Sequence, residues 1–243
     1  MTSTSVAPHA HHLRVQRTAR YYTLGGAGGS PRDIWFVLHG YGQLAGEFIR
    51  FFSDLASDDQ LVVAPEAMNR FYLVSVGRNP ARDRPVGATW MTREDRECEI
   101  ADYVEYLDAL YDEVAAAHVA RGARVQVLGF SQAVATAARW IEHGRATVHR
   151  FIAWGGILPP ETTLAAEAPG LRGVPVVLVA GRRDQYVTPE LLDAERARLD
   201  AASIAYQVFT FDGGHVVSRL VFPQLRERDP QSTADASDDG QTP

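Results

Sequence analysis

The sequence predicts a single α/β domain with a mostly parallel central sheet and helices on both faces. Short apolar runs typical of buried strands alternate with longer helical stretches from about residue 33 to residue 227. Loops rich in glycine and polar residues follow several of these runs, as expected where the carboxyl ends of parallel strands meet. A chain of 243 residues, 46% of them hydrophobic, can bury one core of this kind.

The expected elements alternate along the chain. Strands are predicted over 13–24, 34–38, 61–64, 124–129, 149–154, 175–181 and 204–211. Helices are predicted over 44–57, 94–120, 131–143, 189–202 and 215–227. The glycine-rich stretch 25–31 lies between two predicted strands and does not precede a helix, so it is interpreted as a turn and not as a phosphate-binding loop.

The domain limits follow from composition. We expect a disordered N-terminal tail over 1–12, a folded α/β domain over 13–227 and a disordered acidic tail over 228–243. No apolar run approaches the roughly 20 residues that span a bilayer, and 1–12 lacks the apolar core of a signal peptide. The lone Cys98 cannot form an internal disulfide and is expected to be structural. We therefore expect a cytoplasmic protein without a membrane span.

Charge excludes several classes of function. All 24 basic residues are Arg, and the absence of Lys removes Ser–Lys dyads and Schiff-base chemistry. The net charge of −6, without an Arg-rich stripe, argues against a nucleic-acid partner. We expect a small-molecule substrate and no cofactor or metal; the sequence does not indicate an oligomeric state. His9, His11 and His12 could bind a metal weakly, or could belong to a solvated tail.

Ser131 lies at a predicted strand-to-helix turn, within Gly-Phe-Ser-Gln at 129–132. A serine at such a turn is held in a strained backbone conformation that presents its hydroxyl at the end of the sheet. Small residues are needed two positions to either side, where strand and helix approach closely, and Gly129 and Ala133 meet this need. The same five residues also fit an ordinary turn with a capping serine, so the rest of a triad must decide.

Candidate partners for Ser131 follow in the order Ser, Asp, His. Asp184 comes after the predicted strand 175–181, and His215 comes after the predicted strand 204–211. Carboxyl ends of parallel strands meet at one edge of a sheet, so three separate loops would deliver these side chains to one place. Asp212 is the rival acid, but its place before Gly-Gly-His suggests turn formation.

An oxyanion requires backbone donors, typically the amide after the nucleophile and one from a loop after an earlier strand. Gln132 supplies the first, and Tyr41, within His-Gly-Tyr-Gly at 39–42, is predicted to supply the second. We interpret His39 as a buried histidine that fixes this loop by hydrogen bonding, because His215 already occupies the position of the base.

Five segments within residues 33–220 carry motifs of a known family. They are His-Gly-Tyr-Gly at 39–42, Val-Ala-Pro-Glu-Ala at 63–67, Gly-Phe-Ser-Gln at 129–132, Gly181 with Asp184 and Val187, and Gly-Gly-His at 213–215. In these segments the chain resembles the phospholipase/carboxylesterase family of α/β-hydrolases, which includes the acyl-protein thioesterases. The resemblance implies that the domain over 13–227 has the α/β-hydrolase fold and is a serine hydrolase acting on carboxylic esters or thioesters. Ala133 replaces the customary glycine, and Gln43 stands where many relatives carry Asp.

The substrate pocket is the least determined part of the prediction. The segment 68–91 is expected to be a long loop whose Trp90 and Met91 wall a pocket, or else a surface loop pinned by aromatics. Trp154 could form the acyl side, or could pack the end of the sheet. No long lid insertion is evident, which favours small or accessible acyl groups. We therefore expect a serine carboxylesterase; a thioesterase or lysophospholipase of the same family, and a non-catalytic ligand-binding module on the same fold, are the alternatives.

Overall fold

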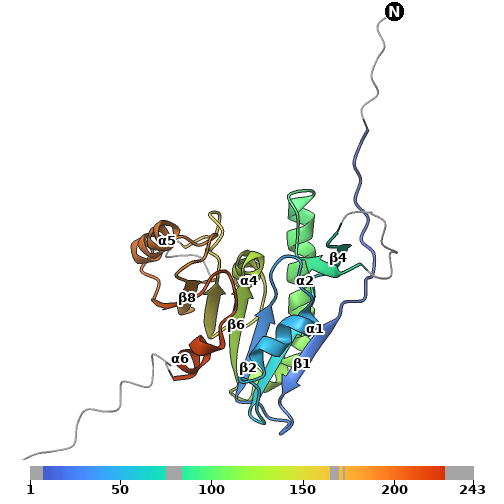
Figure 1. Cartoon of the computed structure of the whole chain (residues 1–243). Coiled ribbons are helices and arrows are strands. Elements are labelled where there is room, and N and C mark those ends of the chain that lie inside the picture. The colour runs from blue at the N-terminus through green and yellow to red at the C-terminus, as the bar shows by residue number, and fades with distance from the viewer. Residues whose placement is uncertain (1–7, 75–83, 165–169, 172, 228–243) are drawn as a thin grey trace, which may run out of the picture.

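A seven-stranded sheet forms the centre of the molecule, as shown by the computed structural model, which describes residues 8–74, 84–164, 170–171 and 173–227 (Figure 1). The strand order is β1-β3-β2-β6-β7-β8-β9. All neighbouring strands are parallel except β1, which pairs antiparallel with β3. The predicted fold class, α/β with a mostly parallel central sheet, is confirmed.

The elements follow the predicted alternation. The strands of the main sheet are β1 (Tyr21–Gly25), β2 (Asp33–Leu38), β3 (Gln60–Pro65), β6 (Arg124–Phe130), β7 (Arg150–Trp154), β8 (Val176–Gly181) and β9 (Tyr206–Phe211). The helices are α1 (Ala45–Phe48), α2 (Arg96–Val114), α3 (Ala116–Val119), α4 (Gln132–His143), α5 (Pro189–Ala201) and α6 (Phe222–Glu227), with 3-10 helices η1 (Ile49–Phe52) and η3 (Arg219–Val221).

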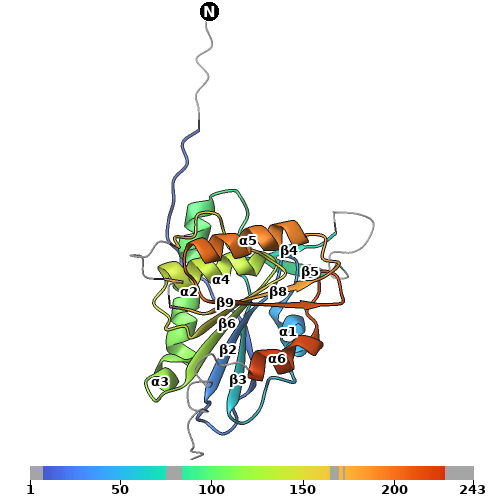
Figure 2. The ribbon, with the colours of Figure 1, turned by 90° about the vertical axis from the view of Figure 1, so that its left-hand side faces the viewer.

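Helices cover both faces of the sheet, since the central strands are apolar on both sides (Figure 2). On one face α2, α4 and α5 bury Tyr103, Trp140 and Leu199 against the strands. On the other face α1, η1 and α6 contribute a second cluster around Phe52 and Phe222. Burial on two sides fixes the sheet rigidly, so loops at its carboxyl edge are held in place.

Several elements differ from the sequence-based expectation. The helix predicted over 44–57 ends at Phe52, and the helix predicted over 215–227 begins only at Arg219. The opening strand is shorter than 13–24, because only Tyr21–Gly25 pairs with β3. The predicted loop 68–91 contains a hairpin of β4 (Asn69–Tyr72) and β5 (Val86–Thr89). Its strands, Asn-Arg-Phe-Tyr and Val-Gly-Ala-Thr, are only four residues long and do not alternate apolar with polar residues, which explains why they were not predicted.

The segment 8–20, here named the N-terminal strap, has no regular secondary structure. Its residues up to Arg17 make exposed polar contacts with α2 and β4, and Arg20 pairs with the buried Glu66 at 2.6 Å. Arg14 pairs with Glu105 of α2 at 2.9 Å, and Arg17 donates to the Asn69 side chain at 3.2 Å. The predicted disordered tails 1–12 and 228–243 fall largely outside the described residues, but residues 8–12 are described and His12 contacts α2. Within the described ranges, no helix has the length and apolar character needed to cross a bilayer.

Candidate active site

Ser131 stands at the sharp turn between β6 and α4. Its φ of 56° and ψ of −120° place a non-glycine residue in a disfavoured backbone region. A methyl group added at Gly129 would lie 2.3 Å from the Ala133 carbonyl oxygen, so only glycine fits before the turn. Ala133 itself is fully buried, and its methyl group packs in the core. The turn therefore accepts alanine at 133 but requires glycine at 129.

Three loops bring Ser131, His215 and Asp184 into one hydrogen-bonded chain. Ser131 Oγ lies 2.8 Å from His215 Nε2, and His215 Nδ1 lies 2.8 Å from Asp184 Oδ2. The carboxylate can only accept, so Nδ1 carries the proton and Nε2 accepts from the serine hydroxyl. The loops follow β6, β8 and β9, all at the carboxyl edge of the sheet.

Asp184 is fixed on both of its oxygens. While Oδ2 faces His215, Oδ1 accepts the backbone amides of Tyr186 at 2.8 Å and Val187 at 3.2 Å. The rival Asp212 is exposed and pairs with the exposed Arg183 at 2.6 Å. The geometry thus selects Asp184 as the partner of His215.

Aromatic rings hold the His215 imidazole from two sides. The Tyr186 ring meets it edge to face at a centroid distance of 4.6 Å, and the Phe130 ring lies 5.0 Å away. Tyr186 is largely exposed, so solvent reaches its ring beside the imidazole. The sequence analysis did not identify Tyr186; its place two residues after Asp184 in the same loop was the available signal.

The loop 39–43 lies beside the nucleophile, because a methyl group at Gly40 would come 3.2 Å from Ser131 Cβ. The Gln43 side chain accepts the Gly40 amide at 2.8 Å, and Gly42 donates to the Ala88 carbonyl of β5 at 2.9 Å. Gln43 therefore shapes this loop. The Tyr41 side chain is exposed and its ring lies 5.2 Å from that of Phe71.

The Gln132 side chain ties the start of α4 to the hairpin. Its Nε2 donates to Thr89 Oγ1 and to the Met91 carbonyl, each at 2.9 Å, and its Oε1 accepts the Trp90 amide at 3.2 Å. The Gln132 backbone amide belongs to the first turn of α4, where amides have no acceptor within the helix. This amide is therefore available to a developing anion next to Ser131.

His39 is fully buried and supports the same loop from below. Its Nδ1 donates to the Gly40 carbonyl at 2.8 Å, and its Nε2 accepts the Ala67 amide at 3.0 Å. Both ring nitrogens are used by the neutral imidazole, and burial lowers the pKa of His39. Its interpretation as a buried, hydrogen-bonding histidine agrees with this geometry.

Two of the predicted pocket residues are in the core instead. Trp90 is 2% exposed and its indole donates to the His39 carbonyl at 2.8 Å. Trp154 is 1% exposed, packs on Phe211 and donates to the Val216 carbonyl at 3.0 Å. The assignment of both as pocket walls is therefore wrong, because side chains this deeply buried face protein on all sides.

Smaller residues border the site in their place. A methyl group at Gly155 would lie 3.1 Å from His215 Cε1, and one at Gly156 would lie 2.9 Å from the Ser131 carbonyl. Met91 is partly buried, and its sulfur lies 3.4 Å from the Arg139 guanidinium. Met91 contacts the site through its backbone carbonyl, which accepts from the Gln132 side chain. Two hollows are evident on the described surface, one around Asp54 and Phe222 and one around Glu142 and Val148, and no residue of the hydrogen-bonded chain lines either.

The sequence also matches a known protein family over most of its length. A family model described as Phospholipase/Carboxylesterase matches residues 29–222. The chain belongs to this family. Membership makes the protein a hydrolase of the α/β-hydrolase type and confirms the resemblance drawn from the sequence motifs.

Solved structures share the fold at low identity. The esterase PE8 is 22% identical with a TM-score of 0.59, over 86% of this chain and 96% of that one. A carboxylesterase from Mesorhizobium loti is 19% identical with a TM-score of 0.63, over 86% and 92%. Zea mays acyl-protein thioesterase 2 is 16% identical with a TM-score of 0.61, over 86% and 96%. No curated protein sequence matches this chain.

Proposed function

We propose that this phospholipase/carboxylesterase family member is a serine carboxylesterase that hydrolyses esters of small or accessible acyl groups. The observation that carries the proposal is the continuous hydrogen-bonded chain from Ser131 through His215 to Asp184, with 2.8 Å at each step. A serine hydroxyl is a weak nucleophile, and an imidazole within this reach can remove its proton as it attacks.

The proposed reaction has two halves. In the first, Ser131 Oγ bonds to the acyl carbon while His215 takes the hydroxyl proton, and the imidazolium then protonates the departing alcohol. In the second, His215 takes a proton from water, which attacks the acyl-enzyme, and returns it to Ser131 as the acid leaves. Asp184 stabilises the imidazolium, and these steps use protein groups and water alone.

The backbone amides of Tyr41 and Gln132 are proposed to hold the oxyanion of each tetrahedral intermediate. The contact between Gly40 and Ser131 supports this assignment, because it places the loop 39–43 next to the reacting atom. Each such donor contributes a factor of about 10² to 10³ in kcat when its geometry is preorganised. The ties of both segments to β5 and to the chain just after it supply that preorganisation.

The test is hydrolysis of p-nitrophenyl esters from acetyl to decanoyl by the full chain, with Ser131→Ala as the matched control. We expect turnover by the natural sequence and a loss of about 10³-fold or more in kcat for the variant, as removal of a triad nucleophile produces elsewhere. The chain-length optimum then gives the reach of the acyl site. Equal rates for both proteins would refute the esterase proposal.

The same experiment separates the alternatives when it is extended to matched thioesters and to a lysophospholipid. Preference for the thioester would assign a thioesterase, an activity carried in the name of one structural neighbour, Zea mays acyl-protein thioesterase 2. Preference for the lysophospholipid would assign a lysophospholipase. Stable ligand binding without turnover of any ester would assign a binding module instead.

A further inference from the structure

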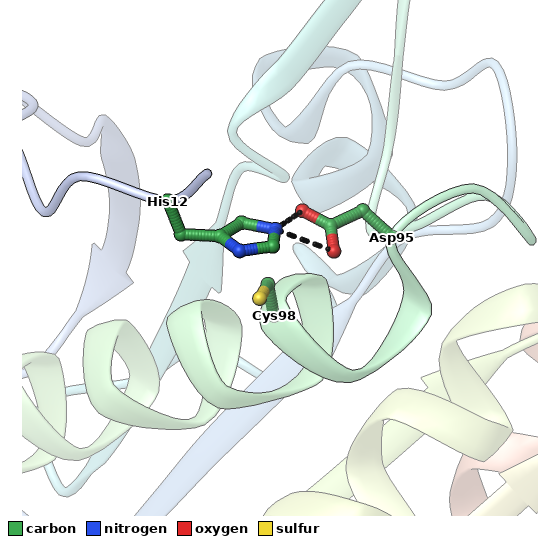
Figure 3. Close-up of side chains that lie close together, drawn as sticks. All are labelled: His12, Asp95 and Cys98. Carbon is green, nitrogen blue, oxygen red and sulfur yellow. Dashed lines mark hydrogen bonds and ion pairs between the residues drawn. The ribbon is translucent and has the colours of Figure 1, made fainter. Parts of the chain in front are cut away.

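A second cluster of chemically active side chains lies outside the proposed active site. His12 of the N-terminal strap, Asp95 at the start of α2 and Cys98 in its first turn converge on one point (Figure 3). One nitrogen, oxygen or sulfur atom from each lies within 4.8 Å of the other two. His12 Nε2 is 3.0 Å from both carboxylate oxygens of Asp95.

The fold brings these residues together from two distant segments. Asp95 directly precedes α2, with a φ of 48°, and Cys98 lies in the first turn of that helix, so one short stretch of chain supplies two of the three groups. The Asp95 carboxylate makes no cap hydrogen bond to α2 and is directed to His12 instead, as Figure 3 shows. The approach of His12 spans 83 residues of sequence, so local chain geometry alone does not account for the cluster.

We propose that His12, Asp95 and Cys98 bind a thiophilic divalent cation, best matched by Zn²⁺, which clamps the N-terminal strap to α2. One thiolate, one imidazole and one carboxylate are ligand types that Zn²⁺ takes in proteins, with a fourth position for water. Hard cations such as Mg²⁺ and Ca²⁺ prefer sites made only of oxygen, which this cluster is not.

The spacing suits a tetrahedral ion after a small adjustment. Bonds of about 2.0 to 2.3 Å place tetrahedral ligand atoms about 3.3 to 3.8 Å apart. The three atoms here are within 4.8 Å, so a shift of about 1 Å closes the site. His12 and Asp95 have side chains that are 62% and 50% exposed, which lets them rotate and lets an ion enter. The ion replaces the protons of the Cys98 thiol and of the His12–Asp95 hydrogen bond, which pass to solvent.

The strap is firmly held only at its C-terminal end, where Arg20 pairs with the buried Glu66 at 2.6 Å, so an ion would add to the half that carries His12. Arg14 and Glu105 form an ion pair with side chains that are 80% and 65% exposed, and such pairs contribute little. A metal held from both the strap and α2 binds only the docked arrangement, so it stabilises that arrangement by mass action. The clamp shares no residue with the chain of Ser131, His215 and Asp184, so it is proposed to be structural.

The test is a Co²⁺ titration of the full chain, free of any histidine tag, followed by displacement with Zn²⁺. Tetrahedral cobalt bound to a thiolate gives a near-ultraviolet charge-transfer band and strong visible bands. Variants Cys98→Ser and His12→Ala should each weaken Zn²⁺ binding by roughly tenfold or more. The matched control is His143→Ala, which removes an exposed histidine that faces the Glu142 carboxylate at 3.9 Å in a pair with no thiol.

A second readout follows the strap itself. Trypsin cleaves after Arg14 and Arg17, and Zn²⁺ should slow this cleavage in the natural sequence but not in Cys98→Ser. Binding without the thiolate band, or binding lost in a His9→Ala, His11→Ala double variant but kept in Cys98→Ser, would assign the ion to the histidine-rich tail and overturn the proposal. Absence of binding would overturn it as well. Ester turnover is not a readout here, so the esterase proposal is tested separately.

Discussion

At the scale of single residues, Ser131 is one of three non-glycine residues of the described chain with a positive φ. Holding a non-glycine residue at φ 56° and ψ −120° costs on the order of 1–3 kcal/mol, which the surrounding structure must offset. The need for glycine at 129 and for small residues nearby follows from that local geometry. Local constraints of this kind leave a pattern in the sequence, which is why the turn, Asp184 and His215 were predictable. Tyr186 was not, because only the folded chain places its ring on His215.

Asp184 can be distinguished from Asp212 by matched substitution. Asp184→Asn should lower kcat for p-nitrophenyl esters by about 10⁴, because an amide in place of the carboxylate favours the wrong imidazole tautomer. Asp212→Asn should leave kcat unchanged, since Asp212 pairs with Arg183 at the surface. Steady-state kinetics on both variants checks this. A larger loss in the second variant would contradict the assignment of Asp184.

Ala133 is expected to affect stability more than rate. Ala133→Gly should cost about 1 kcal/mol of unfolding free energy, because it adds backbone freedom to α4 and removes a buried methyl group. The kcat should not change, since the methyl group packs in the core and not toward the substrate. Urea unfolding together with ester kinetics measures both quantities. Ala137→Gly, in the same helix and equally buried, is the control; a rate change confined to position 133 would show that Ala133 restrains the site.

At the scale of elements, the hairpin β4–β5 is the part of the candidate site that could not be predicted from the sequence. Its strands are short, and nothing in residues 68–91 indicates that Thr89 and Met91 hold the Gln132 side chain. Those contacts join segments more than 40 residues apart. The burial of Trp90 and Trp154 was concealed for a similar reason, since an aromatic residue suits a pocket wall and a core equally well until its neighbours are known.

The Gln132 side chain is expected to position the oxyanion donor through this hairpin. Gln132→Ala removes both hydrogen bonds of its Nε2 and should lower kcat by about 10- to 100-fold, because small misplacements near the reacting atom are costly. KM should change less. Gln126→Ala is the control: it removes a buried glutamine of β6 that accepts from Arg150 at 2.7 Å, and should reduce stability without changing kcat. Equal kcat values for the two variants would contradict the positioning role.

At the scale of the whole molecule, the alternation of strands and helices, the parallel sheet and its two covered faces were all predictable. These features depend on burial patterns that repeat over many residues. The antiparallel edge strand was predicted too long, because the polar contacts of the N-terminal strap with α2 and β4 leave no periodic signal. The cluster at His12 illustrates the same limit: the histidines were evident in the sequence, but their partners on α2 were not.

Global stability should depend on pH through His39. Burial lowers its pKa in the folded state, so below the unfolded-state value of about 6.5 the unfolded chain binds more protons. Its contribution is therefore complete above about pH 6.5 and is lost as the pH falls toward the folded pKa. Urea unfolding between pH 7.5 and pH 5 should show this loss, reduced in His39→Gln and unchanged in the exposed His143→Gln. If the unfolding free energy fell equally with pH in all three proteins, the role of His39 in this pH dependence would be contradicted.

The hydrogen bonds from the Gln132 side chain to Thr89 and Met91 have a consequence for the evolution of this protein. These hydrogen bonds join the hairpin β4–β5 to the turn that carries Ser131, so the two segments are expected to move together. Under the proposed mechanism, a substitution that displaces this hairpin also displaces the Gln132 amide that is proposed to hold the oxyanion. Substrate preference and turnover are therefore expected to change together. A variant with altered substrate preference is expected to need a compensating change at the start of α4 before its turnover recovers.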